Sequence, residues 1–205
     1  MVSTKISDNS EKENILKYSN LKKYLERAKD LLDKKDSVSL GYCALELRRG
    51  IELIVWTQFK DAFYDLVTLK TSIDSFKFKE KTQSQSISKM YEMLKKYCPE
   101  YSKHAQQKSI WTFKSSYGDA PSMEVGKTCY IPSELPNSDY KYLSEILHYE
   151  KEFYPEGFRI DSTKLRAIHK RLKFIEENYT MRLMPIQGNQ ESIIKDFKET
   201  FHFNF

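Results

Sequence analysis

Apolar residues recur along this chain at intervals of three and four, the spacing of amphipathic helices. A first helix is predicted to begin near Ser10, which has capping-box spacing with Glu13, and to end near residue 34. The most apolar stretch runs from about Val38 to Leu66 and predicts a central helix that begins behind Asp36 or Ser37. Since glycine and proline number only six each, long helices are favoured.

The second half of the chain repeats this pattern in shorter pieces. The pattern weakens from Val67 to Ser86, where the polar run FKFKEKTQSQS is a candidate loop, and the periodicity then resumes. One helix starts near Ser86 and ends at Pro99. Another, marked by Tyr140, Leu143, Ile146 and Leu147, follows a cap at Asn137 or Ser138. A third begins behind Asp161 or Ser162 and is stopped by Pro185, and a last amphipathic segment lies near the C-terminus.

Residues 100–136 differ from the rest of the chain. They hold two short β-prone runs, IWTF and TCYI, separated by glycine, proline and serine. We predict a small β-hairpin or a long ordered loop there, inserted in a mainly α, up-and-down helical bundle. The 205 residues fit a single domain over 1–205. The aromatic C-terminal tail, residues 192–205, is expected to dock on this domain or on a partner.

Composition narrows the class of protein. Hydrophobic residues make up 40% and charged residues 31%, which is typical of a globular chain, and the net charge of +5 permits an acidic partner without requiring one. Three widely spaced cysteines suit a reducing compartment and give no zinc motif. We find no signal peptide and no apolar run that could cross a bilayer. We therefore expect a soluble cytoplasmic protein without metal, cofactor or membrane contact.

Four charges lie within the apolar central segment. Arg48 and Glu52 have i, i+4 spacing, and Glu46 and Arg49 have i, i+3 spacing, so both pairs can form ion pairs within a helix. They either keep the outer face solvated or present arginine to a partner. We expect Arg48 to be partly buried against Glu52, and Arg49, beside Trp56, to be the more exposed.

Two further segments are candidate contact surfaces. In KLRAIHKRLK, the basic side chains of Arg166, Lys170 and Lys173 share one helix face, and Arg171 adds to the charge. This strip is either an ordinary solvated face or a weak contact for a nucleic-acid backbone. In the tail, Phe197 and Phe201 belong to an apolar stripe that is expected to be covered, so they are candidate contacts as well.

Two stretches resemble HEPN-type domains. YCALELRRGIELIVW is similar to the second helix of these domains, with Ala44, Arg48 or Arg49, and Glu52 matching its small–Arg–Glu pattern, and YKYLSEILHY is similar to a later LS…H stretch. HEPN domains are helical bundles of prokaryotic toxins, nucleotide-handling accessory proteins and antiviral defence systems. Ribonuclease members carry an arginine followed by a histidine with four to six residues between them, and none of the four histidines here obeys that spacing.

The resemblance therefore implies the scaffold without the usual cutting site. It points to a non-catalytic adaptor bound to protein partners in a larger complex, in prokaryotic antiviral defence with an ATPase and a nuclease. The alternative is a metal-independent RNase toxin whose site is rearranged, with Arg48 or Arg49 paired to His148. Phosphate-binding loops, GxSxG and HExxH are absent from the sequence, so no catalytic residue is assigned.

Overall fold

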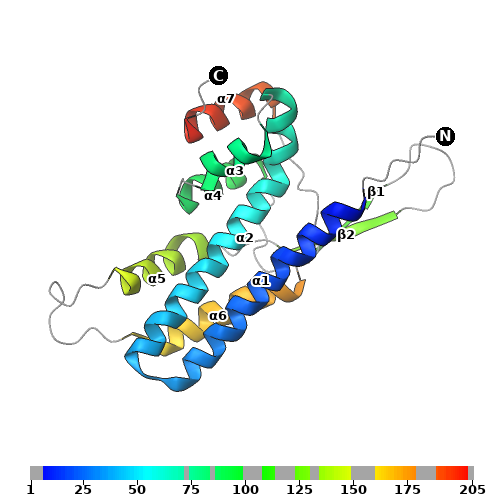
Figure 1. Ribbon diagram of the computed structural model, residues 1–205. Coiled ribbons are helices and arrows are strands. Elements are labelled where there is room, and N and C mark those ends of the chain that lie inside the picture. The colour runs from blue at the N-terminus through cyan, green and yellow to red at the C-terminus, as the bar shows by residue number, and fades with distance from the viewer. Residues whose placement is uncertain are drawn as a thin grey trace. The chain divides into compact units, whose positions relative to one another are not determined.

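The computed structural model describes residues 7–71, 74–83, 86–98, 108–113, 123–129, 134–148, 160–178 and 188–202. Seven α-helices dominate these ranges (Figure 1): α1 (Ser7–Lys34), α2 (Ser37–Thr71), α3 (Ser75–Gln83), α4 (Ile87–Tyr97), α5 (Tyr140–Leu147), α6 (Ser162–Asn178) and α7 (Gln190–Phe201). A π-helical turn, η2 (Leu135–Asp139), leads directly into α5. The predicted mainly α helical bundle is confirmed for the described residues.

Two strands lie within the segment predicted as an insertion. Strand β1 (Lys108–Phe113) pairs with β2 (Met123–Cys129) in antiparallel register, with Lys108 opposite Cys129. Residues 100–107, 114–122 and 130–133 lie outside the described residues, as does their connection to the bundle. The hairpin insertion therefore stays a prediction.

The α-carbon contacts divide the chain into two compact units, a division that the sequence did not indicate. Unit 1 comprises Met1–Gly50 and Tyr142–Glu177, and unit 2 comprises Ile51–Lys141 and Asn178–Phe205. Helix α2 contributes residues 37–50 to the first and residues 51–71 to the second.

Unit 1 is built on three helices, α1, α6 and the first part of α2, to which α5 adds Leu143 and Ile146. Its buried apolar side chains follow the predicted stripes, and they are Leu21, Leu25, Ala28, Leu32, Leu40, Cys43, Ala44, Leu47, Leu143, Ile146, Leu165, Ile168, Leu172 and Ile175. The three helices meet at Gly50, where a Cβ atom would lie 3.4 Å from side-chain atoms of both Leu21 and Leu172. The absent side chain lets these two leucines pack directly over the α2 backbone.

Short polar side chains fix the helix starts, as the sequence predicts. The Asp36 carboxylate accepts a hydrogen bond of 2.8 Å from the Ser39 backbone N–H. The Asp161 carboxylate accepts from the backbone N–H groups of residues 163 and 164 at 2.8 and 3.2 Å, and Ser86 caps α4. These bonds satisfy donors that a helix leaves unpaired in its first turn.

Unit 2 has an aromatic core. Phe59 on α2 lies against Phe78 of α3 and Phe197 of α7, with ring centres 6.2 and 6.0 Å apart, and Phe197 lies 5.6 Å from Phe78. Phe201 closes the cluster at 5.2 Å from Phe59. All these rings are buried, so the C-terminal helix docks in cis on the chain's own unit.

Three local expectations are wrong. Helix α1 begins at Ser7, so Ser10 lies inside the helix and is not its cap. Residues 75–83 form α3 instead of a loop, because the buried ring of Phe78 anchors the helix and the buried Thr82 hydroxyl donates a hydrogen bond to the Phe78 carbonyl oxygen. Asn137 and Ser138 lie inside the π-helical turn and do not cap α5.

The aromatic core predicts a sharp difference between two positions on α7. We expect Phe197→Ala to lower the free energy of unfolding by about 3–5 kcal/mol, because it removes a ring with partners on two other helices. Lys195→Ala, at an exposed site on the same helix, changes it by less than about 0.5 kcal/mol. Urea unfolding followed by circular dichroism measures both. Equal effects of the two substitutions would mean that α7 is not part of the core.

Candidate functional site

The first part of α2 carries an apolar row on its outer side. Val38, Tyr42, Leu45 and Arg49 follow one another at i, i+4, i+7 and i+11, within about 60° of one another around the helix. The buried residues of the same segment point to the opposite side. Val38 is 67% exposed and Tyr42 is 60% exposed, and Leu45 is half-buried. We call these four residues the outer face of α2.

A carboxylate bridges two arginines beside this face. Glu46 Oε2 accepts hydrogen bonds from Arg27 Nε at 3.0 Å and from Arg27 Nη2 at 2.6 Å, and Glu46 Oε1 lies 3.6 Å from Arg49 Nη1. The Glu46 side chain is only 13% exposed, whereas Arg27 and Arg49 are 48% and 50% exposed. The predicted Glu46–Arg49 pair is confirmed, and Arg27 is a partner that local spacing cannot reveal.

The other charged residues of α2 differ in their surroundings. Arg48 is half-buried and Arg49 exposed, as their helix positions predict, whereas the Arg48–Glu52 pair stays a prediction. Within unit 2, Glu52 accepts a hydrogen bond of 2.9 Å from the Tyr140 hydroxyl. Trp56 is half-buried, and the Lys60 ammonium lies 5.8 Å from its ring centre.

The basic strip of α6 lies along α1 in unit 1 and is partly neutralised. Arg166 Nη2 lies 3.8 Å from an Asp33 carboxylate oxygen and donates at 3.4 Å to the Leu32 carbonyl oxygen. Lys173 pairs with Glu177 at 3.5 Å, Lys170 is exposed, and Arg171 is half-buried. The strip thus helps to hold α6 on α1, and its phosphate contact stays a prediction.

His169 lies beside this strip on α6 and is half-buried. Its Nε2 lies 3.0 Å from the Leu25 carbonyl oxygen, so the neutral ring can donate a hydrogen bond across the helix pair. Burial lowers the pKa of His169 below its ordinary value of 6.5, and the nearby charges of Lys173, Lys29 and Arg166 lower it further. The ring is therefore a neutral structural contact at neutral pH.

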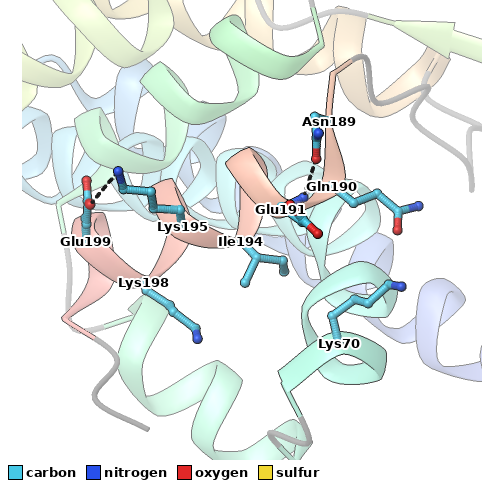
Figure 2. A pocket seen from close by; sticks show the side chains of 8 residues that line it. All are labelled: Lys70, Asn189, Gln190, Glu191, Ile194, Lys195, Lys198 and Glu199. Carbon is cyan, nitrogen blue, oxygen red and sulfur yellow. Dashed lines mark hydrogen bonds and ion pairs between the residues drawn. The ribbon is translucent and has the colours of Figure 1, made fainter.

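A shallow hollow with mixed charge lies in unit 2 between the end of α2 and α7 (Figure 2). Ile194 faces it between Lys70 and Lys198, and Lys195 lies 3.9 Å from Glu199 in an i, i+4 pair. The remaining lining residues are Asn189, Gln190 and Glu191. Lysines and glutamates nearly cancel here, which gives the hollow no strong preference for an anion or a cation.

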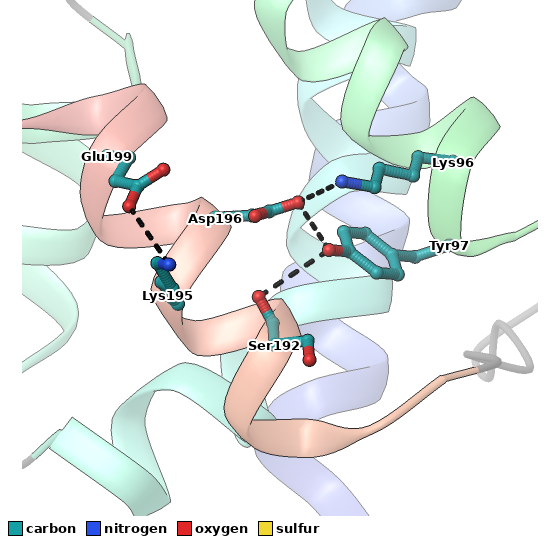
Figure 3. A network of polar contacts seen from close by, with 6 residues as sticks. All are labelled: Lys96, Tyr97, Ser192, Lys195, Asp196 and Glu199. Atoms are coloured by element: carbon teal, nitrogen blue, oxygen red, sulfur yellow. Dashed lines mark hydrogen bonds and ion pairs between the residues drawn. The ribbon is translucent and has the colours of Figure 1, made fainter.

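A polar network joins α4 to α7 within unit 2. The Asp196 carboxylate accepts from both the Lys96 ammonium and the Tyr97 hydroxyl, and the same hydroxyl lies 3.5 Å from the Ser192 carbonyl oxygen (Figure 3). These hydrogen bonds from Lys96 and Tyr97 lower the pKa of Asp196 below its ordinary value of 3.8. The network holds α7 against α4.

Phe197 and Phe201, predicted as contact residues, lie in the core of unit 2. Their rings are fully buried, with centres 4.8 Å apart, so their surface is used by the chain itself. Neither ring is exposed for contact with a partner. Residues 203–205 of the predicted docking tail lie outside the described residues.

Cys43 and Cys98 are poor nucleophiles. Burial raises the pKa of Cys43 and of Cys98 to about 12, so both are neutral thiols at physiological pH. Within the described ranges, histidine, cysteine, aspartate and glutamate form no group of three that could hold a metal ion. Nor does any helix in these ranges combine the length and apolar character needed to cross a bilayer.

Comparison with protein-family models, curated proteins and solved structures gives no match to this chain. The inference about function therefore depends on the residues themselves.

The lowered pKa of His169 makes the stability of unit 1 depend on pH in mild acid. In the unfolded chain His169 has its ordinary pKa, whereas in the folded chain its pKa is lower. The unfolded chain therefore binds the proton more readily. Stability is therefore fully present above about pH 6.5 and is lost as the pH falls through the window below it. We expect the thermal midpoint to fall between about pH 7.5 and about pH 5.5, and His169→Gln to reduce this fall.

His148→Gln is the matched control, because His148 is an exposed histidine of the same unit. Circular dichroism at each pH gives the midpoints of the three proteins. If His169→Gln shows the same acid-dependent fall as the unmodified chain, the buried ring is not its source.

Proposed function

We propose that this chain is a non-catalytic, HEPN-like accessory subunit that binds a protein partner in the cytoplasm. The outer face of α2 carries the proposal. Val38 and Tyr42 are large apolar side chains exposed next to one another on a helix whose opposite side is already covered by its own unit. Tyrosine and arginine are also the residue types enriched where protein interfaces gain most of their energy.

The resemblance to HEPN domains supplies the setting. In this proposal the partners are an ATPase and a nuclease of a prokaryotic antiviral system, and the chain joins them without cutting RNA. The small–Arg–Glu pattern that suggests the resemblance lies on α2, the helix that presents the exposed face. The mainly α bundle of the described residues agrees with the expected scaffold.

The alternative function is an RNase toxin with a rearranged site. One observation favours it: Arg48, Arg49 and His148 all belong to unit 1, although they are far apart in the sequence. His148 is exposed at the end of α5, where it could meet a substrate.

Assembly tests the accessory role. We expect the tagged chain to co-purify with products of neighbouring genes, and Val38→Ser combined with Tyr42→Ser to abolish this. The two side chains are exposed, so the thermal midpoint stays within a few degrees of that of the unmodified chain. Leu69→Ser combined with Phe76→Ser, at the exposed apolar positions of unit 2, serves as the control and leaves assembly intact.

RNA cleavage tests the alternative. We expect the purified chain to leave total RNA intact over hours, because no arginine has the spacing to a histidine that ribonuclease members use. Cleavage that disappears on His148→Ala or Arg48→Ala would replace the accessory role by the toxin role. Cleavage that survives both substitutions would indicate a contaminating nuclease.

A further inference from the structure

Helix α1 runs beside the first part of α2 within unit 1 (Figure 1). Arg27 of α1 reaches Glu46 of α2, and its guanidinium lies 5.1 Å from the ring centre of Tyr24, one turn earlier on α1. We call the combined surface the α1–α2 patch, and its members are Tyr24, Arg27, Val38, Tyr42, Leu45 and Arg49. Both helices belong to unit 1, so the patch is a feature of one compact body.

The charge of this patch is positive. Two half-exposed guanidiniums share one carboxylate, that of Glu46, which is itself largely buried. Lys23 and Lys34 are exposed on the same side of α1, within about 40° of Arg27 around the helix, and the exposed carboxylate of Asp30 lies within about 60°. Glu46 holds the two arginines in place, and together with Asp30 it offsets two of the four cations. The net charge of the patch is therefore positive, so it attracts carboxylates from a partner.

The apolar row has the spacing of a helix-packing ridge. Steps of four, three and four residues keep its members in line over three turns, about 16 Å along the axis. A second helix with apolar residues at the same alternation packs against such a row. Arg49 at the end of the row and Arg27 beside it can bind aspartate or glutamate in a bidentate manner. Such contacts fix the register of the incoming helix.

We propose that the α1–α2 patch binds an amphipathic helix of a partner protein, with acidic residues flanking its apolar stripe. This inference rests on the proposed function and names the chemistry of the partner. A second copy of the chain fits less well, because it brings the same arginines and lysines and so sets like charges against one another. A nucleic acid would meet the positive charge but would leave the aliphatic Val38 and Leu45 without a partner.

Photocrosslinking identifies the occupant directly. Tyr42 is replaced by p-benzoylphenylalanine in the full chain, the chain is expressed in the cells of its source, and the adduct is mapped by mass spectrometry. We expect an adduct with a segment of another protein that has apolar residues at three- and four-residue spacing and glutamate or aspartate beside them. An adduct with a second copy, with a nucleic acid or with a segment that lacks acidic residues would overturn the proposal, as would no adduct.

Charge reversal then tests the role of the arginines. The probe is a synthetic peptide of the crosslinked segment, and binding is measured with the full chain. We expect Arg49→Glu to raise Kd about tenfold or more, and added salt to weaken binding of the unmodified chain. Lys170→Glu makes the same change of charge at an exposed position on α6 and leaves Kd nearly unchanged.

The outcomes separate the two levels of inference. Assembly that survives substitution of Val38 and Tyr42 removes the accessory role at this surface, and the acidic-helix proposal with it. Assembly that depends on Tyr42 but is equally sensitive to Arg49→Glu and Lys170→Glu, or to neither, overturns only the acidic helix and leaves the accessory role in place.

Discussion

The apolar length of α2 is the constraint on which the rest of this structure depends. A helix with apolar residues on most of its sides exposes too much surface unless other elements cover it. Within unit 1, α1 and α6 cover one side of its first part, and within unit 2, α3 and α7 contribute rings that cover the aromatic end. Each core is thus organised by its own stretch of the same helix.

The charged residues within α2 lie where neighbouring helices do not cover it. Opposite the core of unit 1 the helix meets water, and there Glu46 and Arg49 appear together with Val38 and Tyr42. Glu46 is nonetheless largely buried, because α1 passes close enough for Arg27 to bind it. A carboxylate in that position is stable only with a cationic partner, and here it has two. The pairing places two guanidiniums at a surface that is otherwise apolar.

Features that depend on nearby residues could be predicted from the sequence. The apolar stripes, the caps at Asp36 and Asp161 and the Glu46–Arg49 pair all involve residues within a few positions of one another. Features that depend on distant residues could not be predicted. Nothing near Glu46 indicates Arg27, which lies on another helix.

The same limit explains the misassigned elements. Helix α3 is short and polar, and it is stabilised through one ring, Phe78, which packs on aromatic partners from α2 and α7. The π-helical turn depends on a backbone hydrogen bond of 2.7 Å from the Asp139 N–H to the Glu134 carbonyl, a spacing of five residues that side-chain periodicity does not encode. In both cases tertiary packing and backbone geometry override local propensity.

The burial of α7 also decides which aromatic residues remain for recognition. A C-terminal stripe of this kind could serve a partner only if its own unit left it uncovered. Instead Phe197 packs against phenylalanines from two other helices. Asp196 of the same helix accepts hydrogen bonds from Lys96 and Tyr97. Extracting it would expose several large rings, each with a burial free energy of about 1.5–3 kcal/mol. Tyr42 and Val38 need no such rearrangement, because they are exposed in the folded unit, and this difference supports α2 over the tail as the proposed contact surface.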